Sequence, residues 1–229
     1  MIKMIDFQRE WKLNQESFCS AIEQVCASGQ YIQGDAVKEF ENRLSDYLGV
    51  EHVISCANGT DALQIVLMAL DLERGDEVIV PAFTYVATVE VLLLLGLKPV
   101  YADIDPLSFN IDLDSVKRVF SKKTKAIIPV HLFGKVANIS GLMSFARNNK
   151  ISVIEDTAQA LGSSLHIDNT EIFSGTFSHV GTTSFFPTKN LGCFGDGGAM
   201  FTNDDNLAQK LRMIASHGQS SKYVHDIVG

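Results

Sequence analysis

The sequence predicts an α/β protein with a mostly parallel sheet flanked by helices. From about residue 52 onward, short apolar runs alternate with longer amphipathic stretches, which is the pattern of successive βα units. The 229 residues are 46% hydrophobic, enough to form one large core. No internal repeat, low-complexity stretch or Pro/Ser-rich linker divides the chain. We therefore expect an N-terminal helical arm over residues 1–50 and one main domain over residues 51–229.

The individual elements follow from their periodicity. Short apolar runs predict strands at residues 52–56, 77–80, 99–102, 126–130, 151–154 and 199–202, with a further run around residues 182–185. Apolar residues at helical spacing predict helices at residues 60–70, 85–95, 113–120, 139–148 and 206–216. Before residue 50, two further helical stretches are expected at residues 14–27 and 35–48.

Composition and charge exclude several classes of protein. A net charge of −8 argues against a nucleic-acid-binding surface, which needs clustered Lys and Arg. The N-terminus lacks the features of a secretory signal, and the apolar run at residues 91–95 is far short of a membrane span. A cytoplasmic protein with no membrane partner is expected. The four cysteines and six histidines show no metal-ligand spacing, so no metal site is expected.

Ligands of an open α/β sheet collect at the carboxyl ends of its strands, where helix N-termini offer unpaired N–H groups. The first candidate there is the turn from Asn58 to Asp61, between a predicted strand and a predicted helix. Gly59 lets the backbone approach an anion and Thr60 adds a hydroxyl donor, so the turn suits a phosphate. A plain helix cap by Asn58 explains the turn equally well.

The second candidate is Asp156 with Gln159, directly after a strongly apolar predicted strand. A carboxylate held in a partly desolvated crevice pairs well with a protonated ring nitrogen. The alternative is another helix cap, made by Asp156 and Thr157.

The third candidate is Lys189, which lies between an aromatic, proline-containing segment and the glycine-rich stretch 192–198. A lysine held against packed backbone is a usable nucleophile toward an aldehyde, whereas an ordinary loop lysine is merely solvated. The glycines lead into a strand and not into a helix, which excludes a dinucleotide-binding fingerprint. No Gly-x-Ser-x-Gly elbow or Walker loop is present.

Seven segments in this order resemble the DegT/DnrJ/EryC1/StrS family of sugar aminotransferases: ANGTDALQ, GDEVIVPAFTYVATVE, KPVYADIDPLSFNID, TKAIIPVHLFG, VIEDTAQALG, SFFPTKNLGCFGDGGAMFTNDD and LRMIASHGQ. The resemblance runs from about residue 5 to the last residue. It implies the large domain of a fold type I transferase that uses pyridoxal 5′-phosphate. Family members close with a smaller C-terminal domain, which this chain is expected to lack.

The resemblance assigns the chemistry to three residues. Lys189 resembles the lysine that forms a Schiff base with the cofactor and later moves a proton between substrate and cofactor. Asp156 resembles the partner of the pyridinium nitrogen, which keeps the ring an electron sink. Gln159 is similar to the residue that hydrogen-bonds the ring hydroxyl.

The resemblance also assigns the binding of the cofactor's phosphate and ring face. Gly59, Thr60 and Asp61, together with Ser184, resemble the phosphate cradle. Tyr85 resembles the aromatic residue that stacks on the ring.

The implied reaction is transfer of an amino group from glutamate to a nucleotide-linked keto sugar in a homodimer. A dehydratase branch of the family has histidine in place of the catalytic lysine, so Lys189 favours transamination. The amino-acid sequences of the motifs look closest to those of enzymes that aminate UDP-linked 3-keto-N-acetylglucuronate for surface polysaccharides such as lipopolysaccharide O-antigen. The alternative is a truncated, inactive family member that serves as an interaction module.

Overall fold

The computed structural model describes residues 4–229, so the first three residues of the expected arm lie outside it. The chain forms two compact units, Met1–Arg43 and Leu44–Gly229. The first holds helix α1 (Phe7–Ser28) and most of α2 (Asp35–Leu48), whose last turn belongs to the second unit. Helix α1 begins earlier than predicted because the Asp6 carboxylate accepts a hydrogen bond from the Arg9 N–H at 3.2 Å.

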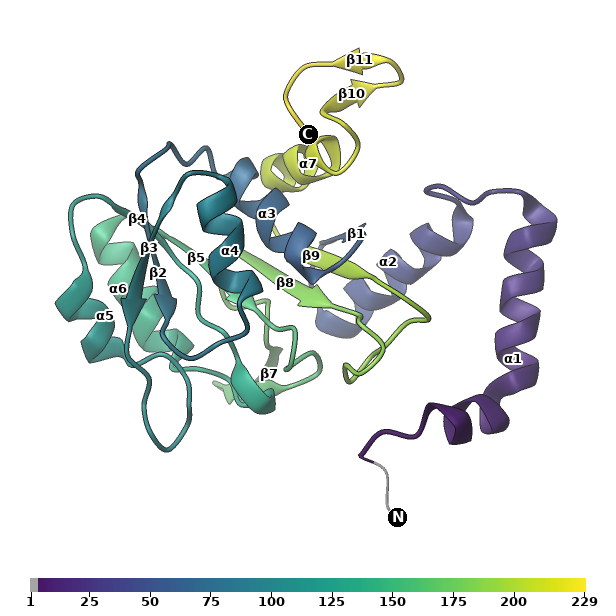
Figure 1. Cartoon of the computed structure of the whole chain (residues 1–229), viewed down its shortest axis with the longest axis horizontal. Helices are drawn as coiled ribbons and strands as arrows, with labels where there is room; N and C mark the ends of the chain where they lie inside the picture. The colour runs from purple at the N-terminus through teal and green to yellow at the C-terminus, as the bar shows by residue number, and fades with distance from the viewer. Residues whose placement is uncertain (1–3) are drawn as a thin grey trace. The chain divides into compact units, whose positions relative to one another are not determined.

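The second unit is built on a seven-stranded sheet of order β1-β9-β8-β5-β4-β2-β3 (Figure 1). Its strands are β1 (His52–Cys56), β2 (Glu77–Pro81), β3 (Lys98–Ala102), β4 (Thr124–Ile127), β5 (Ser152–Asp156), β8 (Val180–Ser184) and β9 (Gly198–Thr202). Only β9 runs against its neighbours, β1 and β8, and the other adjoining pairs of this sheet are parallel. The predicted fold class is confirmed, and each predicted strand overlaps an observed one.

Helices cover both faces of this sheet. On one face lie α3 (Gly59–Ala69), α4 (Ala87–Leu94) and α7 (Asp205–Ile214), and on the other α5 (Leu113–Val119) and α6 (Ile139–Asn149) (Figure 1). The alternation of side chains along a strand divides the core in the same way. Val78 and Val80 of β2 pack in the cluster with α3 and α4, whereas Ile79 packs in the cluster with α5 and α6. A short 3₁₀ turn, η1 (Leu132–Gly134), follows β4.

Two small hairpins were not predicted from the sequence. Strands β6 (Ser164–Ile167) and β7 (Thr170–Phe173) pair antiparallel, as do β10 (Gln219–Ser221) and β11 (Val224–His225). The turn between β6 and β7 is Asp168-Asn169, with φ values of 48° and 64°. Two consecutive positive φ values are typical of the tight hairpin turn that Asp and Asn favour, so this signal was present in the sequence.

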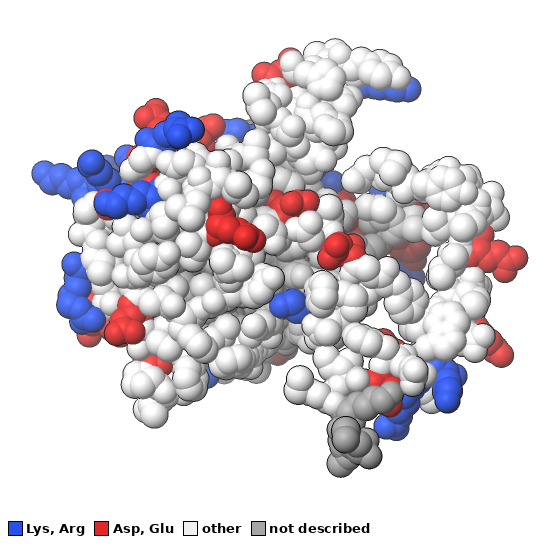
Figure 2. Space-filling model, viewed as in Figure 1, with Lys and Arg blue, Asp and Glu red and all other residues white. Residues whose placement is uncertain are grey.

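Charge and hydropathy agree with the composition. Figure 2 shows Lys and Arg interspersed with Asp and Glu on the face that it draws, without a continuous basic surface. Among residues 4–229, no helix is both long and apolar enough to cross a membrane.

Candidate active site

A cavity of about 570 Å³ lies at the carboxyl ends of the central strands. Its walls come from the N-terminus of α3, the loop between β2 and α4, and the ends of β5 and β8. All eight cofactor-binding candidates from the sequence line this one cavity: Gly59, Thr60, Asp61, Tyr85, Asp156, Gln159, Ser184 and Lys189. The fold therefore brings together three segments that the sequence singled out separately.

The phosphate candidate is the first turn of α3. Asn58 caps this helix, since its Oδ1 accepts a hydrogen bond from the Asp61 N–H at 2.8 Å and its Nδ2 donates to the Asp61 carboxylate at 3.2 Å. The cap interpretation is thus confirmed, and both the N–H and the carboxylate of Asp61 are engaged by Asn58. The N–H groups of Gly59 and Thr60 lie in the first turn of the helix, where no intrahelical acceptor exists. Both the cap and an anion site are compatible with this turn.

Close packing explains the glycines around this turn. A Cβ on Gly59 would lie 2.7 Å from the Cβ of Ser184, and a Cβ on Gly198 would lie 2.4 Å from the carbonyl carbon of Asn58. The α3 turn therefore lies against the end of β8 and the start of β9, where Gly198 pairs with Ser184. Bare backbone at a helix N-terminus beside a hydroxyl group is the chemistry that binds a phosphate.

Asp156, the last residue of β5, is 6% exposed and lines the cavity. Its Oδ1 accepts from the Ala158 N–H at 3.0 Å and its Oδ2 accepts from the Thr88 hydroxyl at 3.2 Å. Burial raises the pKa of this carboxyl, while those two hydrogen bonds and the charge of Lys189 act to lower it. No regular helix follows Asp156, so the interpretation of this residue as a helix cap was wrong.

Gln159 and Tyr85 reach the cavity from two different loops. The Gln159 Oε1 accepts a hydrogen bond from the Phe133 N–H at 2.8 Å, which fixes the amide so that its NH₂ group is the end able to donate to a ligand. Tyr85 is 72% exposed and precedes α4, which begins at Ala87 and not at the predicted residue 85. Its ring is therefore carried on the cavity rim by a loop.

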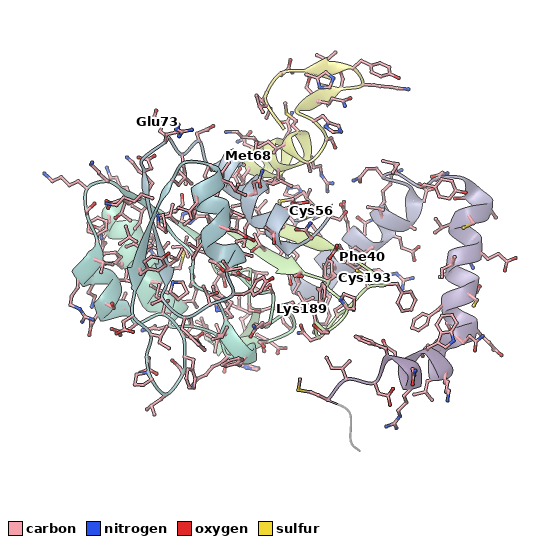
Figure 3. The ribbon with its side chains drawn as sticks, in the orientation of Figure 1. Phe40, Cys56, Met68, Glu73, Lys189 and Cys193 are labelled. Carbon is pink, nitrogen blue, oxygen red and sulfur yellow. The ribbon has the colours of Figure 1, made fainter. Side chains whose placement is uncertain are left out.

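Lys189 is half-buried in the loop after β8, the loop that also carries Cys193 (Figure 3). Backbone hydrogen bonds hold this loop: the Lys189 N–H donates to Phe186 O at 2.8 Å, and the Cys193 N–H donates to Phe185 O at 2.8 Å. A Cβ on Gly192 would lie 2.4 Å from the carbonyl oxygen of Pro187, so the glycine lets the loop fold back on itself. The loop is held by its own backbone hydrogen bonds, while Phe186, Leu191 and Phe194 within it are exposed.

Several polar residues of the cavity were missed by the sequence analysis, among them Thr84, Thr88 and Asp196. The hydroxyl oxygens of Thr84 and Thr88 lie 3.2 Å apart. Thr84 precedes α4, so no regular helical spacing relates the two residues, and neither they nor Asp196 had a signal in the sequence.

A second buried carboxylate supports the site from behind. Glu155 precedes Asp156 in β5, is fully buried, and accepts hydrogen bonds from the N–H groups of Gly175, Phe177 and Ser178 at 2.8–3.0 Å. It also lies 2.8 Å from Nε2 of His131. The other ring nitrogen, Nδ1, accepts from a backbone N–H at 3.1 Å, so Nε2 carries the proton that is donated to Glu155.

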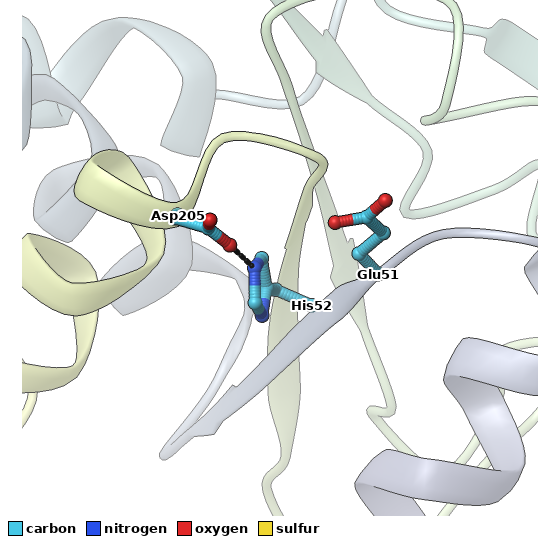
Figure 4. Close-up of side chains that lie close together, drawn as sticks. All are labelled: Glu51, His52 and Asp205. Carbon is cyan, nitrogen blue, oxygen red and sulfur yellow. Dashed lines mark hydrogen bonds and ion pairs between the residues drawn. The ribbon is translucent and has the colours of Figure 1, made fainter.

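One group of metal-ligand type lies at the other end of β1. Ligand atoms of Glu51, His52 and Asp205 lie within 4.8 Å of one another, and His52 Nε2 is 2.7 Å from Asp205 Oδ1 (Figure 4). Glu51 and Asp205 are exposed, and Asp205 begins α7, where an acidic residue complements the helix dipole. This group stands apart from the cavity.

The cysteines offer no nucleophile beside the cavity. All four thiols are free. Burial raises the pKa of Cys56 to about 12, helped by the negative charge of Asp61, and burial also raises the pKa of Cys193. A protonated thiol is a poor nucleophile. Lys189 is the one residue among those lining the cavity whose side chain carries an amine.

Fold and site together define a class of protein: an α/β protein whose cavity offers one amine, one buried carboxylate and a glycine-lined helix terminus to a single ligand. The chain belongs to the DegT/DnrJ/EryC1/StrS aminotransferase family, whose model matches residues 12–229. The resemblance found in the sequence motifs is confirmed.

Similar proteins come from several bacteria. Over 229 residues the chain is 50% identical to a UDP-2-acetamido-2-deoxy-3-oxo-D-glucuronate aminotransferase of Pseudomonas aeruginosa, covering 100% of this chain and 63% of that protein. A solved aminotransferase of this family from Brucella abortus is 42% identical, with a TM-score of 0.91 over 100% of this chain and 62% of that one. A Bacillus subtilis structure with bound cofactor PMP is 35% identical, with a TM-score of 0.86 over 93% and 48%. The chain thus spans less than two thirds of these relatives.

Proposed function

We propose that the cavity binds pyridoxal 5′-phosphate and that the chain carries the cofactor-binding part of a sugar aminotransferase. The observation that supports this most is the convergence of Lys189, Asp156 and the α3 turn on one cavity. The donor set fits the cofactor's three functional groups, since an amine suits the aldehyde, a carboxylate the ring nitrogen, and bare N–H groups the phosphate. When bound, pyridoxal phosphate supplies an electron sink for the carbon that exchanges its proton.

Each residue has a distinct task in this proposal. Asp156 holds the ring nitrogen protonated, because a buried carboxylate gains most from a cationic partner. Gln159 donates its NH₂ group to the ring hydroxyl. The amine of Lys189 would hold the aldehyde carbon of the cofactor, and as a free amine it would be the base that moves the proton of the substrate carbon. Lys189 can serve as that base because its loop is held at the cavity wall by backbone hydrogen bonds.

The remaining candidates bind and orient the cofactor. Gly59, Thr60 and Ser184 offer N–H and hydroxyl donors to the phosphate, while Asp61 keeps the helix terminus capped. Tyr85, on the cavity rim, would pack against one face of the ring. A fixed phosphate and a covered face hold the reacting carbon within reach of the lysine.

For the reaction, we propose glutamate as the amino donor and a nucleotide-linked keto sugar as the acceptor. The relative from Pseudomonas aeruginosa supports a UDP-linked 3-keto-N-acetylglucuronate in particular. Such a product serves surface polysaccharide synthesis, and the working form is proposed to be a homodimer. We further propose that residues 1–50 act as a helical arm to the cofactor-binding domain 51–229.

The cofactor assignment is tested by spectroscopy and reductive trapping. The purified chain with added pyridoxal phosphate should show a visible absorption band that borohydride bleaches, and mass spectrometry should place the trapped group on Lys189. Lys189→Ala should lose both the band and the trapped group. Lys125→Ala, which changes an exposed lysine of β4, is the matched control and should keep both. Trapping on another lysine with Lys189 unmodified rejects the assignment.

The transfer itself is tested separately, with glutamate as donor and UDP-linked 3-keto-N-acetylglucuronate as acceptor. Formation of the amino sugar by the same chain supports the whole proposal. Cofactor trapping on Lys189 without transfer leaves the cofactor assignment standing and rejects transfer by this chain.

A further inference from the structure

A short chain of hydroxyl groups joins the cavity to Asp156. Thr88, the second residue of α4, is 1% exposed, and its Oγ1 lies 3.2 Å from Asp156 Oδ2. The same oxygen lies 3.2 Å from Oγ1 of Thr84, a half-buried residue that lines the cavity. The three side chains all line the cavity and form one hydrogen-bonded chain that ends at the buried carboxylate.

The direction of the hydrogen bonds along this path follows from the number of protons. An ionised carboxylate only accepts, so the single hydroxyl proton of Thr88 must be donated to Asp156. Thr88 then has no proton left for Thr84, and the Thr84 hydroxyl must donate to Thr88. The Thr88 hydroxyl bonds more strongly to the ionised carboxylate than to the protonated acid, so the two hydroxyls favour the charged form of Asp156.

The surroundings of Asp156 make this contribution important. Its backbone is fixed through both of its polar groups, because the Asp156 N–H donates to Pro129 O and the Asp156 carbonyl accepts from the His131 N–H. The side chain has two neutral donors, the Thr88 hydroxyl and the Ala158 N–H, and one cationic neighbour, Lys189. His131 is itself hydrogen-bonded to Glu155. Once Lys189 is covalently linked to a ligand, the Thr88 hydroxyl becomes one of few groups that keep Asp156 charged.

We propose that Thr88 is a positioning residue that holds Asp156 ionised and aimed into the cavity, so that Asp156 can keep a bound heterocyclic nitrogen protonated. This inference rests on the proposed binding of pyridoxal phosphate. Thr84 acts one step further out, by orienting the Thr88 hydroxyl toward the carboxylate.

The test compares Thr88→Val, Thr88→Ser and the wild-type chain, each loaded with pyridoxal phosphate. In Thr88→Val a methyl group replaces the hydroxyl, the carboxylate loses a donor, and the ring proton is held less firmly. A less positive ring makes the imine nitrogen more basic, so the absorption band of the bound cofactor should change at a higher pH. We expect an upward shift of roughly half a pH unit or more and about tenfold weaker cofactor binding, the loss typical of one hydrogen bond to a charged group. Thr88→Ser should restore both values.

A matched control separates this effect from a general loss of packing. Thr202 is also buried, and its hydroxyl donates to the His179 carbonyl at 2.9 Å in β9, away from Asp156. Thr202→Val should lower stability but leave the pH of the spectral change unshifted. If Thr88→Val does not fold, Thr88→Ala removes the same hydroxyl without adding a methyl group and should give the same upward shift.

The outcomes distinguish this inference from the proposed function. If the wild-type chain shows no band that is trapped on Lys189, the cofactor assignment fails. If the wild type binds the cofactor and the hydroxyl-free variants keep its spectral transition and its affinity, the role of Thr88 is overturned while the cofactor assignment stands. A shift in Thr88→Ser as large as that in Thr88→Val also overturns it.

Discussion

A nearly inaccessible carboxylate lies at each end of the central strands, one at their amino ends (the amino edge) and one at their carboxyl ends (the carboxyl edge). The two carboxylates have different partners. Glu77 begins β2 at the amino edge, where Lys98 Nζ lies 2.8 Å away and the Ser121 hydroxyl donates a second hydrogen bond. These partners, Lys98 first, lower the pKa of Glu77. Asp156 ends β5 at the carboxyl edge, where burial raises its pKa.

The difference shows at which edge the carboxylate already has a cationic partner within the chain. Glu77 has a cationic partner in direct contact, so the interaction serves the stability of the fold. Asp156 accepts from two neutral donors and faces a cavity, so its charge gains most when a cationic ligand enters. The pH dependences are opposite. Glu77 contributes stability above its unfolded-state pKa and loses it as the pH falls through its lower folded-state pKa, whereas Asp156 costs stability as the pH rises through its raised folded-state pKa.

The largest expected effect concerns the neighbour of Asp156 in the same strand. Glu155→Ala leaves the N–H groups of Gly175, Phe177 and Ser178 and the ring of His131 without their acceptor in the interior. Each buried donor left without an acceptor costs about 1–3 kcal/mol, so the four together should cost at least about 4 kcal/mol. Urea denaturation should show that loss of unfolding free energy. Glu171→Ala, at an exposed glutamate of β7, should change it by less than about 0.5 kcal/mol. Equal effects at both positions would contradict this account.

A glycine at each edge sharpens the comparison next. Gly198→Ala forces a Cβ to within 2.4 Å of the Asn58 carbonyl carbon and must displace the α3 turn, so pyridoxal phosphate should bind at least about tenfold more weakly, or roughly 1.4 kcal/mol. Gly75→Ala, before β2, meets open space but has φ +90°, so it should cost about 1 kcal/mol of stability and leave cofactor affinity unchanged. Fluorescence titration with the cofactor measures the first quantity and urea denaturation the second. Equal affinity losses would show that the α3 turn has no special part in binding.

Removing the charge of Asp156 should separate stability from function. Because burial raises the pKa of Asp156, Asp156→Asn should stabilise the cofactor-free chain at pH 8 by about 0.5–2 kcal/mol while weakening cofactor binding. The advantage of the variant should shrink as the pH falls toward 5, since protonation relieves the same cost in the wild type. Urea denaturation at both pH values, without cofactor, measures it. If the stability of Asp156→Asn relative to the wild type is lower at pH 8 than at pH 5, the carboxyl pKa of Asp156 is not raised by folding.

How far the sequence predicted this molecule depends on the range of the interactions involved. The alternation of strands and helices, the sheet class and the eight cavity residues could be predicted because short apolar runs and local motifs carry them. The antiparallel course of β9 could not, since strand direction depends on pairing between Gly198 and residues far away along the chain. The contact between Thr88 and Asp156 spans 68 positions and has no local signature. The cap at Asp6 was local and was overlooked.

The smallest expected change in unfolding free energy is at the amino edge, where its sign is opposite to that at Asp156. Lys98→Met keeps the apolar stem and removes the cation that lowers the pKa of Glu77. Because the Lys98 side chain is 64% exposed, solvent screens the pair and the loss at pH 7 should be only about 0.5–1 kcal/mol. The difference in unfolding free energy between Lys98→Met and the wild type should fade as the pH is lowered and Glu77 becomes protonated in both. The difference at Asp156 also fades at low pH, but there the variant is the more stable protein, whereas here it is the wild type. Lys125→Ala should show no such difference, and a deficit of Lys98→Met that persists when Glu77 is protonated would mean that packing and not charge joins the two residues.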